Sequence, residues 1–277
     1  YSNSSIRKIY SELNKGFEIA MDDDIIVRNP MKKRAVKKPY SKKTDKKIVA
    51  LTVEQQNLFI NYLNNEPMPT HGCDYRYQFF IEMFAGLRMG EINALQYNDI
   101  DLQNNVIHVS KTITRGVNER VLIGEKPKTY AGYRDVLISD ELRPYLIQLL
   151  MNYRNNKGNL LFYDYDNSKP ISTARVNCSF KRICKKIGIY KEGFAQHMLR
   201  HTFATRCIEA GVSAEVLMTW LGHSSIDITI DTYTDVQVGY KKDNLNKLNS
   251  YLSKAISFTD EKCTPNAHFS YTPFEKP

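Results

Sequence analysis

The sequence lacks the long apolar runs of a membrane protein. No hydrophobic stretch approaches the roughly 18 residues of a membrane-spanning helix, and no secretory signal pattern stands at its start. The five cysteines are odd in number and form no C-x-x-C pair, so they suggest neither a disulfide framework nor a zinc site. Paired Asp/Glu residues at metal-ligand spacing are also missing. We therefore expect a cytoplasmic protein with no metal or other cofactor.

The composition is that of an ordinary globular protein. Of the 277 residues, 42% are hydrophobic and 25% are charged. This length allows one large domain of about 200 residues and a smaller piece. Because the chain begins at Tyr1 rather than Met, we expect it to be part of a longer protein.

Positive charge is concentrated in one segment near the start. Ten basic residues and one acid, Asp45, lie between Arg28 and Lys47, so the segment carries 10 − 1 = +9, equal to the net charge of the whole chain. A solvated tail is one interpretation. A basic segment between two helical regions could instead follow DNA phosphates. The residues that we expect to contact DNA are Lys32, Lys33, Arg34, Lys37, Lys38, Lys42, Lys43, Lys46 and Lys47.

Apolar periodicity predicts an α+β protein that is mainly helical with a small antiparallel sheet. Helices are expected at residues 3–26, 52–63, 74–85, 140–154, 172–187, 200–210 and 213–221, and strands at 106–109, 121–123 and 136–138. Thr52 is the expected N-cap of the second helix, and Gly86 ends the third. Residues 126–132 would be the loop between the last two strands.

Two arginine-containing strings could bind a phosphate. Arg88 lies in Gly-Leu-Arg-Met-Gly-Glu with Glu91 three residues on, which taken alone predicts only a surface ion pair. His197 and Arg200 have H-x-x-R spacing, which places both on one side of a first helical turn. The adjacent His201 is expected to point elsewhere and to be structural. Two nearby aromatic residues, Phe203 and Trp220, are expected in the core.

Three further residues complete the set of groups that phosphodiester chemistry needs. Lys128 lies in Lys-Pro-Lys-Thr on the predicted hairpin, where Lys126 is the competing choice for a proton donor. His223 follows Leu221-Gly222 and would supply an imidazole donor. The alternative is that it only caps the preceding helix. Tyr233 would supply a nucleophilic phenol, as one of 18 tyrosines.

Arg88, Lys128, His197, Arg200, His223 and Tyr233, in this order and in these strings, resemble the active-site series of the tyrosine recombinases. The sequence around these residues is most similar to that of integrases of conjugative transposons and phages, and the similarity covers roughly residues 50–257. The resemblance implies that the two arginines clamp the scissile phosphate, that Glu91 supports Arg88, and that Tyr233 attacks. Asp235 stands where many members have histidine two positions after the tyrosine.

The resemblance also implies an architecture. Residues 1–30 would be the last part of a helical core-binding domain, 31–48 a basic linker and 49–240 the catalytic domain. Residues 241–277 would be a C-terminal helix and tail that neighbouring protomers could exchange. Their apolar positions at helical spacing are Leu245, Leu248, Leu252 and Ile256. Packing of this helix on its own domain is the alternative.

The implied function is site-specific DNA recombination through a 3′-phosphotyrosyl intermediate, without metal or ATP. The implied partners are double-stranded DNA, further copies of the protein in a tetrameric complex, and an accessory directionality protein. Relaxation of DNA by a type IB topoisomerase, a catalytically silent DNA-binding regulator and a metal-dependent nuclease are the alternatives. The last lacks ligand-spaced carboxylates, and the regulator should have lost Tyr233 or an arginine.

Overall fold

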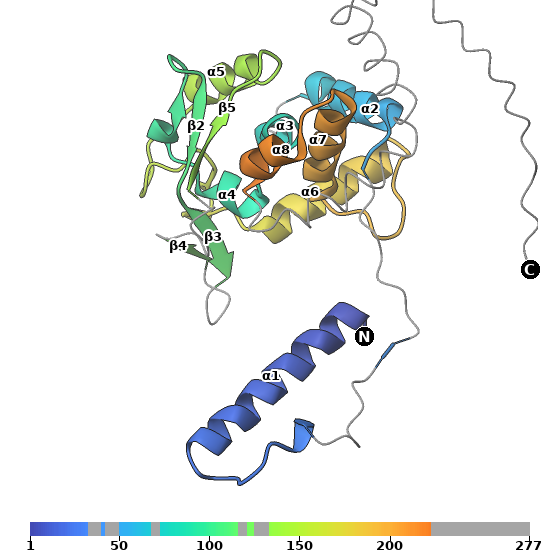
Figure 1. The fold of residues 1–277 in the computed structure, drawn as a ribbon. Helices are drawn as coiled ribbons and strands as arrows, with labels where there is room; N and C mark the ends of the chain where they lie inside the picture. Colours follow the sequence, from blue (N-terminus) through green and yellow to red (C-terminus); the bar gives the residue numbers. More distant parts are fainter. Residues whose placement is uncertain (33–39, 42–49, 68–72, 116–120, 125–132, 223–277) are drawn as a thin grey trace, which may run out of the picture.

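The protein is mainly helical, with small antiparallel sheets at one side of the helices (Figure 1). The coordinates are those of a computed structural model that describes residues 1–32, 40–41, 50–67, 73–115, 121–124 and 133–222. Within these ranges no helix is both long and apolar enough to cross a membrane. The predicted α+β class is confirmed.

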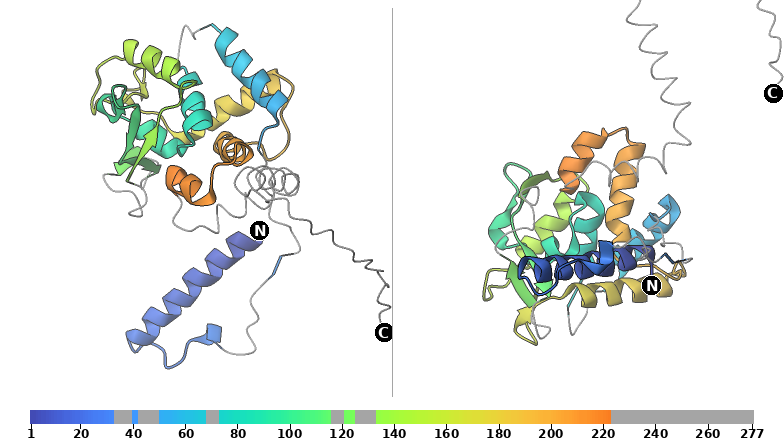
Figure 2. Two further views of the ribbon diagram at one scale, coloured as in Figure 1. Left: turned by 45° about the horizontal axis from the view of Figure 1, so that its top comes forward. Right: turned by 60° about the horizontal axis from the view of Figure 1, so that its bottom comes forward.

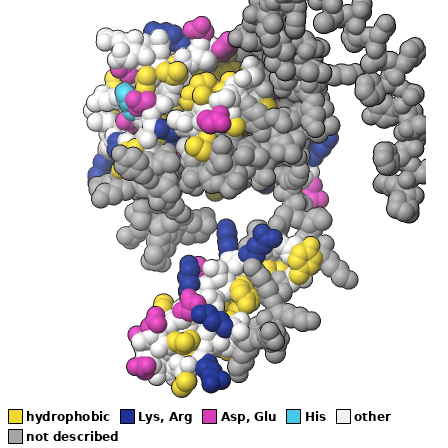
Figure 3. Space-filling view, viewed as in Figure 1, with side chains coloured by type: hydrophobic (Ala, Val, Ile, Leu, Met, Phe, Trp, Pro, Cys, Tyr) yellow, Lys and Arg dark blue, Asp and Glu magenta, His cyan; other side chains and the backbone are white. Residues whose placement is uncertain are grey.

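The first helix, α1 (Asn3–Asp22), begins after Ser2, whose hydroxyl accepts a hydrogen bond from the Ser5 backbone NH. It ends four residues before the predicted residue 26, and Asp24 already has a positive φ of 55°. The chain then turns back into a 3-10 helix, η1 (Pro30–Lys32). Exposed apolar side chains lie along α1 among lysines and arginines, as Figure 3 shows.

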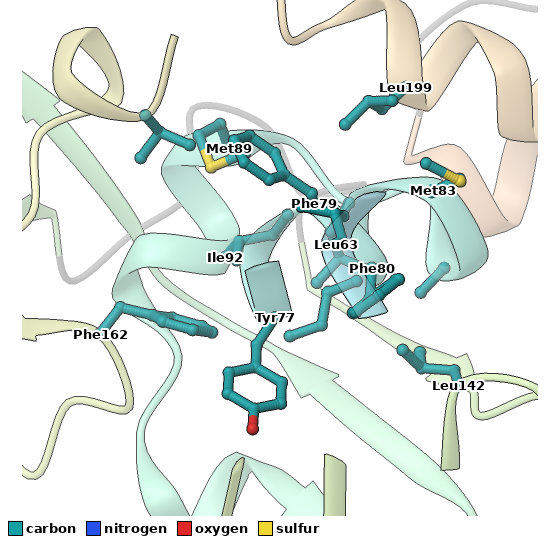
Figure 4. Close-up of a cluster of buried hydrophobic side chains, with 14 of the residues drawn as sticks. Leu63, Tyr77, Phe79, Phe80, Met83, Met89, Ile92, Leu142, Phe162 and Leu199 are labelled. Carbon is teal, nitrogen blue, oxygen red and sulfur yellow. The ribbon is translucent and has the colours of Figure 1, made fainter. Parts of the chain in front are cut away.

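The core forms where α2 (Val53–Asn65), α3 (Arg76–Ala85) and α6 (Thr173–Lys186) meet. Helix α2 starts with the predicted N-cap, because Thr52 and Gln55 each accept a hydrogen bond from the other's backbone NH. Almost every residue of α3 is buried, and Figure 4 shows its Phe79 and Phe80 surrounded by other apolar side chains. This burial makes α3 a fixed base for the loop that follows it.

The strands form three small sheets within the described ranges. The first sheet has the order β1 (Ile100–Asp101), β2 (Val106–Val109), β5 (Arg134–Leu137); β3 (Thr112–Arg115) pairs with β4 (Val121–Gly124), and β6 (Tyr163–Asp164) with β7 (Lys169–Pro170). All pairings are antiparallel.

The expected hairpin around Lys128 is wrong in its pairing. The strands on either side of that residue do not pair with each other, since β4 pairs with β3 and β5 pairs with β2. Alternation of apolar residues marks a strand but does not specify its partner. Residues 125–132, with Lys126 and Lys128, lie outside the described ranges.

The turn from α3 into α4 (Met89–Ala94) depends on two glycines. Gly86 caps α3 with a φ of 65°, and a Cβ at this position would lie 2.4 Å from a ring carbon of Phe203. A Cβ on Gly90 would lie 2.8 Å from the Thr112 hydroxyl on β3. Gly86 therefore lets the two strings of the expected site approach each other closely, and Gly90 lets α4 approach β3.

The remaining helices of the described residues are η2 (Tyr97–Asp99), α5 (Arg143–Met151), α7 (Met198–Glu209) and α8 (Ala214–Leu221). Helix α5 is shorter than predicted at both ends, and α7 begins two residues earlier than predicted, after His197. Phe203 and Trp220 pack against the apolar cluster that α7 and α8 share, as expected. Helices α7 and α8, orange in Figures 1 and 2, lie beside α3, and the ends of these helices form the site.

Candidate active site

Arg88 stands at the N-terminus of α4, where its side chain is 42% exposed. One guanidinium nitrogen, Nη1, donates to Glu91 Oε1 at 2.9 Å, and Nη2 donates to the carbonyl oxygen of Gly222 at 2.9 Å. The backbone NH of Arg88 donates to the other Glu91 oxygen, also at 2.9 Å. The ion pair predicted at this position is therefore present, but Glu91 is buried instead of lying on the surface.

Arg200 lies in the first turn of α7 and is only 3% exposed. Its Nη1 donates to Gly86 O at 2.7 Å and its Nη2 to Leu221 O at 2.6 Å, so one guanidinium joins the C-terminal ends of α3 and α8. Burial, together with the neighbouring Arg88, lowers the pKa of Arg200 to about 9. The cation is thus held in a place where additional negative charge would stabilise it.

A third arginine, Arg134, belongs to the same cluster and was not among the predicted site residues. Its side chain is 5% exposed, and its Nη1 and Nη2 donate to the two Glu91 oxygens at 3.2 and 2.8 Å. Its Nε donates to Trp220 O at 2.8 Å. No local pattern shows that Arg134 binds Glu91, because the two are 43 residues apart.

Glu91 therefore accepts hydrogen bonds from two arginines. Burial would raise the pKa of this carboxyl, but the hydrogen bonds and charge of Arg134, and then those of Arg88, outweigh it and hold the pKa at about 2. The carboxylate stays ionised at neutral pH and fixes both guanidinium planes.

The three arginines end on three successive carbonyl groups. Arg134, Arg200 and Arg88 donate to the carbonyls of Trp220, Leu221 and Gly222, respectively, at the C-terminus of α8. The C-terminal end of a helix carries partial negative charge, so cations are favourable there. This arrangement fixes the end of α8 immediately before His223.

His197 occupies the N-cap position of α7, and its side chain is 39% exposed. Its ring lies edge-on to that of His201, with 5.0 Å between the centroids, so His201 faces His197 and does not point elsewhere. Burial, then the positive surroundings of His201, Arg200 and Arg88, lower the pKa of His197 to about 4. The imidazole is neutral at neutral pH, which leaves one ring nitrogen free to accept a proton.

The buried acid Glu82, which lies close to His197, was also not among the predicted site residues. Glu82 of α3 is fully buried, and its Oε1 lies 4.0 Å from His197 Nδ1. Burial raises the pKa of Glu82 well above its usual range, and the charge of Arg200 offsets this only in part. Its position in the middle of the apolar run Phe-Phe-Ile-Glu-Met-Phe was the available sequence signal.

The structure thus brings Arg88, Glu91, His197 and Arg200 together. The other three predicted catalytic residues, Lys128, His223 and Tyr233, lie outside the described ranges, as do all the linker lysines and arginines except Lys32. Lys32 is exposed and its Nζ lies 3.2 Å from Glu18 Oε1 on α1. Guanidinium forks close to a neutral imidazole are suited to hold a phosphate and to accept a proton beside it.

Comparisons with known proteins show what the chain as a whole is similar to. Residues 49–239 match the phage integrase family. A transposase from transposon Tn916 of Enterococcus faecalis is 26% identical over 260 residues, which cover 90% of this chain and 62% of the relative. A tyrosine recombinase of Agathobacter rectalis is 26% identical over 271 residues, covering 93% of this chain and 79% of that protein.

The fold is shared with solved structures. The Tn1549 transposon integrase, determined in complex with a circular intermediate DNA, superimposes with a TM-score of 0.72 at 25% identity, covering 90% of this chain and 80% of the other. This chain spans less than two thirds of the length of the Tn916 transposase. The family match covers most of the chain and includes both arginine strings, and the chain belongs to the phage integrase family.

Proposed function

We propose that this protein is a site-specific DNA recombinase, an integrase of a mobile element. The observation that carries the proposal is that Arg88 and Arg200 meet at the end of α8 and that both of their charges act on His197. Membership of the phage integrase family supports it, as do relatives described as transposases and tyrosine recombinases. The Tn1549 integrase, whose fold this chain shares, is described with a circular intermediate DNA.

In the proposed reaction, the Tyr233 oxygen attacks the phosphorus of one DNA strand. The new bond joins phosphorus to the tyrosine oxygen, and the bond to the 5′ oxygen breaks. His197 accepts the phenol proton, and Lys128 gives a proton to the departing 5′ oxygen. Arg88, Arg200 and His223 donate hydrogen bonds to the non-bridging oxygens.

Rejoining is the reverse step with a different strand. The 5′ hydroxyl of a partner strand attacks the phosphotyrosine and releases Tyr233. One phosphoester replaces another in each step, so the reaction needs no ATP, and the cationic donors supply the stabilisation that a metal supplies elsewhere.

The proposed organisation places DNA between two parts of the chain. Residues 1–30 belong to the core-binding domain, residues 31–48 to a linker that follows phosphates, and residues 49–240 to the catalytic domain. The exposed apolar side chains of α1 suit a helix that packs within a larger helical domain. Residues 241–277 dock on a neighbouring protomer in a tetramer on double-stranded DNA. A directionality protein assists this complex on the bacterial nucleoid, in the cytoplasm.

The test is covalent capture. The protein is incubated in EDTA with DNA of the element's end, nicked so that the cleaved strand loses a short fragment that diffuses away. We expect an adduct that resists denaturant and maps by peptide mass spectrometry to Tyr233. Tyr233→Phe removes only the attacking oxygen, so the adduct should vanish while DNA binding stays.

The matched control is Tyr240→Phe, which should form the adduct normally. Exchange of strands between two marked DNA duplexes separates recombination from relaxation by a topoisomerase. Binding of DNA without any adduct would leave a silent regulator, and an adduct on another tyrosine would contradict the assignment of the nucleophile.

A further inference from the structure

The buried acid Glu82 has no hydrogen-bond partner for either side-chain oxygen among the described residues. The residue is 0% exposed. Burying an unpaired carboxyl group disfavours folding, so such a group persists in a core only where something offsets the loss of its hydration. The other buried acids in the described part of the chain are paired: Glu91 binds two arginines, and Asp164 binds Arg175 and Asn167.

The carboxyl group of Glu82 faces the start of helix α7, which has His197 as its N-cap and Arg200 in its first turn. Glu82 lies one turn before Gly86 on α3, and the carbonyl of Gly86 binds Arg200, so the acid lies beneath the arginine and histidine of α7. His197 lies close to it, with 4.0 Å between Oε1 of Glu82 and Nδ1 of His197. Arg200 is the cation that acts on Glu82, while His201 and Arg88 act on His197 from α7 and from the start of α4.

A histidine that takes a proton at one nitrogen works best when the other nitrogen is held. An acceptor at Nδ1 fixes the tautomer with hydrogen on Nδ1 and leaves Nε2 free, and a carboxylate also stabilises the imidazolium that forms. His197 needs this help because its other charged neighbours, Arg88 and Arg200, are positive and oppose its protonation. Glu82 is the carboxyl on the Nδ1 side.

We propose that Glu82 is a positioning residue for strand cleavage: its carboxylate accepts the Nδ1–H of His197 and keeps Nε2 turned toward the tyrosine proton. The inference rests on the proposed function, in which His197 accepts that proton. The 4.0 Å separation closes to a hydrogen bond when DNA docks, since catalytic hydrogen bonds are often long in unliganded enzymes. The proton balance is simple: the phenol proton moves to Nε2, and the Nδ1–H stays shared with Glu82.

The proposal predicts a specific dependence on pH. A protonated carboxyl group cannot accept the Nδ1–H, so the cleavage rate should fall as pH drops through the pKa of Glu82, which burial raises well above its usual range. Glu82→Gln removes this titration but keeps an acceptor oxygen. Glu82→Met removes the acceptor too, with little change in side-chain length.

Single-turnover cleavage is measured with the full chain on saturating nicked DNA, over the acid and neutral range. Glu82→Met should slow cleavage about a hundredfold and Glu82→Gln about tenfold, the scale of losing part of general base catalysis. The acid limb that Glu82 produces should disappear in both variants. DNA affinity should change by less than about threefold, since Glu82 touches no phosphate.

The decisive measurement repeats Glu82→Met in a His197→Ala background. If Glu82 acts through His197, Glu82→Met should slow cleavage by less than about twofold in the His197→Ala background, because the effects of coupled residues do not add. Asp164→Asn is the control for loss of a buried carboxylate elsewhere, and it should leave the pH profile unchanged.

An equal loss in both backgrounds, or unchanged cleavage by Glu82→Met, would overturn the inference. Failure of the inference is distinguishable from failure of the proposed function. Adduct formation at Tyr233 by the wild-type protein together with normal Glu82 variants rejects only the role of Glu82. Absence of any wild-type adduct rejects the recombinase proposal itself.

Discussion

Replacement of Arg134 by methionine tests whether the buried pair with Glu91 holds the site together. The substitution removes two hydrogen bonds to Glu91 and one to the carbonyl of Trp220. Methionine fills most of the arginine volume, so the loss of the charge and of these hydrogen bonds dominates. Glu91 would keep the two hydrogen bonds from Arg88.

Two estimates of the lost free energy of unfolding agree. Removing one partner of a buried ion pair costs about 3–5 kcal/mol, and the side chains here are 5% and 8% exposed. The difference between the ordinary glutamate pKa of 4.5 and the value of about 2 for Glu91 corresponds to about 3 kcal/mol. Because Arg88 retains part of the pairing, we expect the free energy of unfolding to fall by about 3 kcal/mol. In a domain of this size, that loss lowers the melting temperature by about 6–12 °C.

Urea unfolding followed by circular dichroism, with a parallel thermal scan, gives the free energy of unfolding. Lys186→Met is the control, because its pair with Glu66 is exposed, with 60% and 39% of the two side chains accessible, and should contribute at most about 1 kcal/mol. A loss of less than about 1 kcal/mol in Arg134→Met would refute the reasoning, since the pair would then behave as an exposed one.

The pH dependence gives a second check of the same pair. The folded pKa of Glu91 lies below its unfolded value, so its stabilisation is complete above about pH 4.5 and is lost as pH falls toward about 2. Wild-type stability should decline through this window. The Arg134→Met variant should decline less, since much of the pairing is already absent.

Other substitutions address the chemistry and the DNA contacts. Arg88→Lys and Arg200→Lys keep the charge but lose the fork, so cleavage on bound DNA should fall about a hundredfold while the dissociation constant changes little; an equal fall in affinity at an unchanged rate would make these arginines DNA-positioning groups only. Neutralising lysines between Lys32 and Lys47 should weaken binding to all DNA sequences and reduce the salt slope by about one for each phosphate that is no longer neutralised; an unchanged slope would identify a solvated tail. Deleting residues from Asp243 onward should leave monomeric DNA binding but reduce assembly, as measured by sedimentation on DNA; unchanged assembly and unchanged cleavage together would exclude a role for the tail.

Local signals in the sequence predicted the elements that depend on neighbours along the chain. Thr52 and Gln55 form the expected N-terminal cap, and Gly86 ends α3 as expected, because capping involves residues a few positions apart. The H-x-x-R spacing placed His197 and Arg200 on the same turn. Only the family resemblance implied that they lie near Arg88, since no periodicity relates residues more than a hundred positions apart.

The parts that the sequence did not predict depend on long-range contacts. Arg134 was one of 39 basic residues, and only the fold shows that it joins Glu91 to the end of α8. The pairing of β4 with β3 was missed because alternation gives no partner. Glu82 had a signal, a lone acid in an apolar helix, but its direction toward His197 follows from how α3 packs on α7.

The charge balance at the end of α8 explains what kind of ligand the cluster suits. Arg88, Arg134 and Arg200 contribute three positive charges and Glu91 one negative charge, which leaves 3 − 1 = +2. The C-terminal ends of α3 and α8, on which these guanidinium groups lie, each contribute about half a negative charge. The buried Glu82 beside Arg200 adds no charge while it is protonated, the form that its burial favours, so these groups leave a surplus of about one positive charge, which equals the single negative charge of a phosphodiester. A phosphate group in a DNA strand would make this cluster neutral and offset both causes that lower the pKa of Arg200, its burial and the neighbouring charge of Arg88.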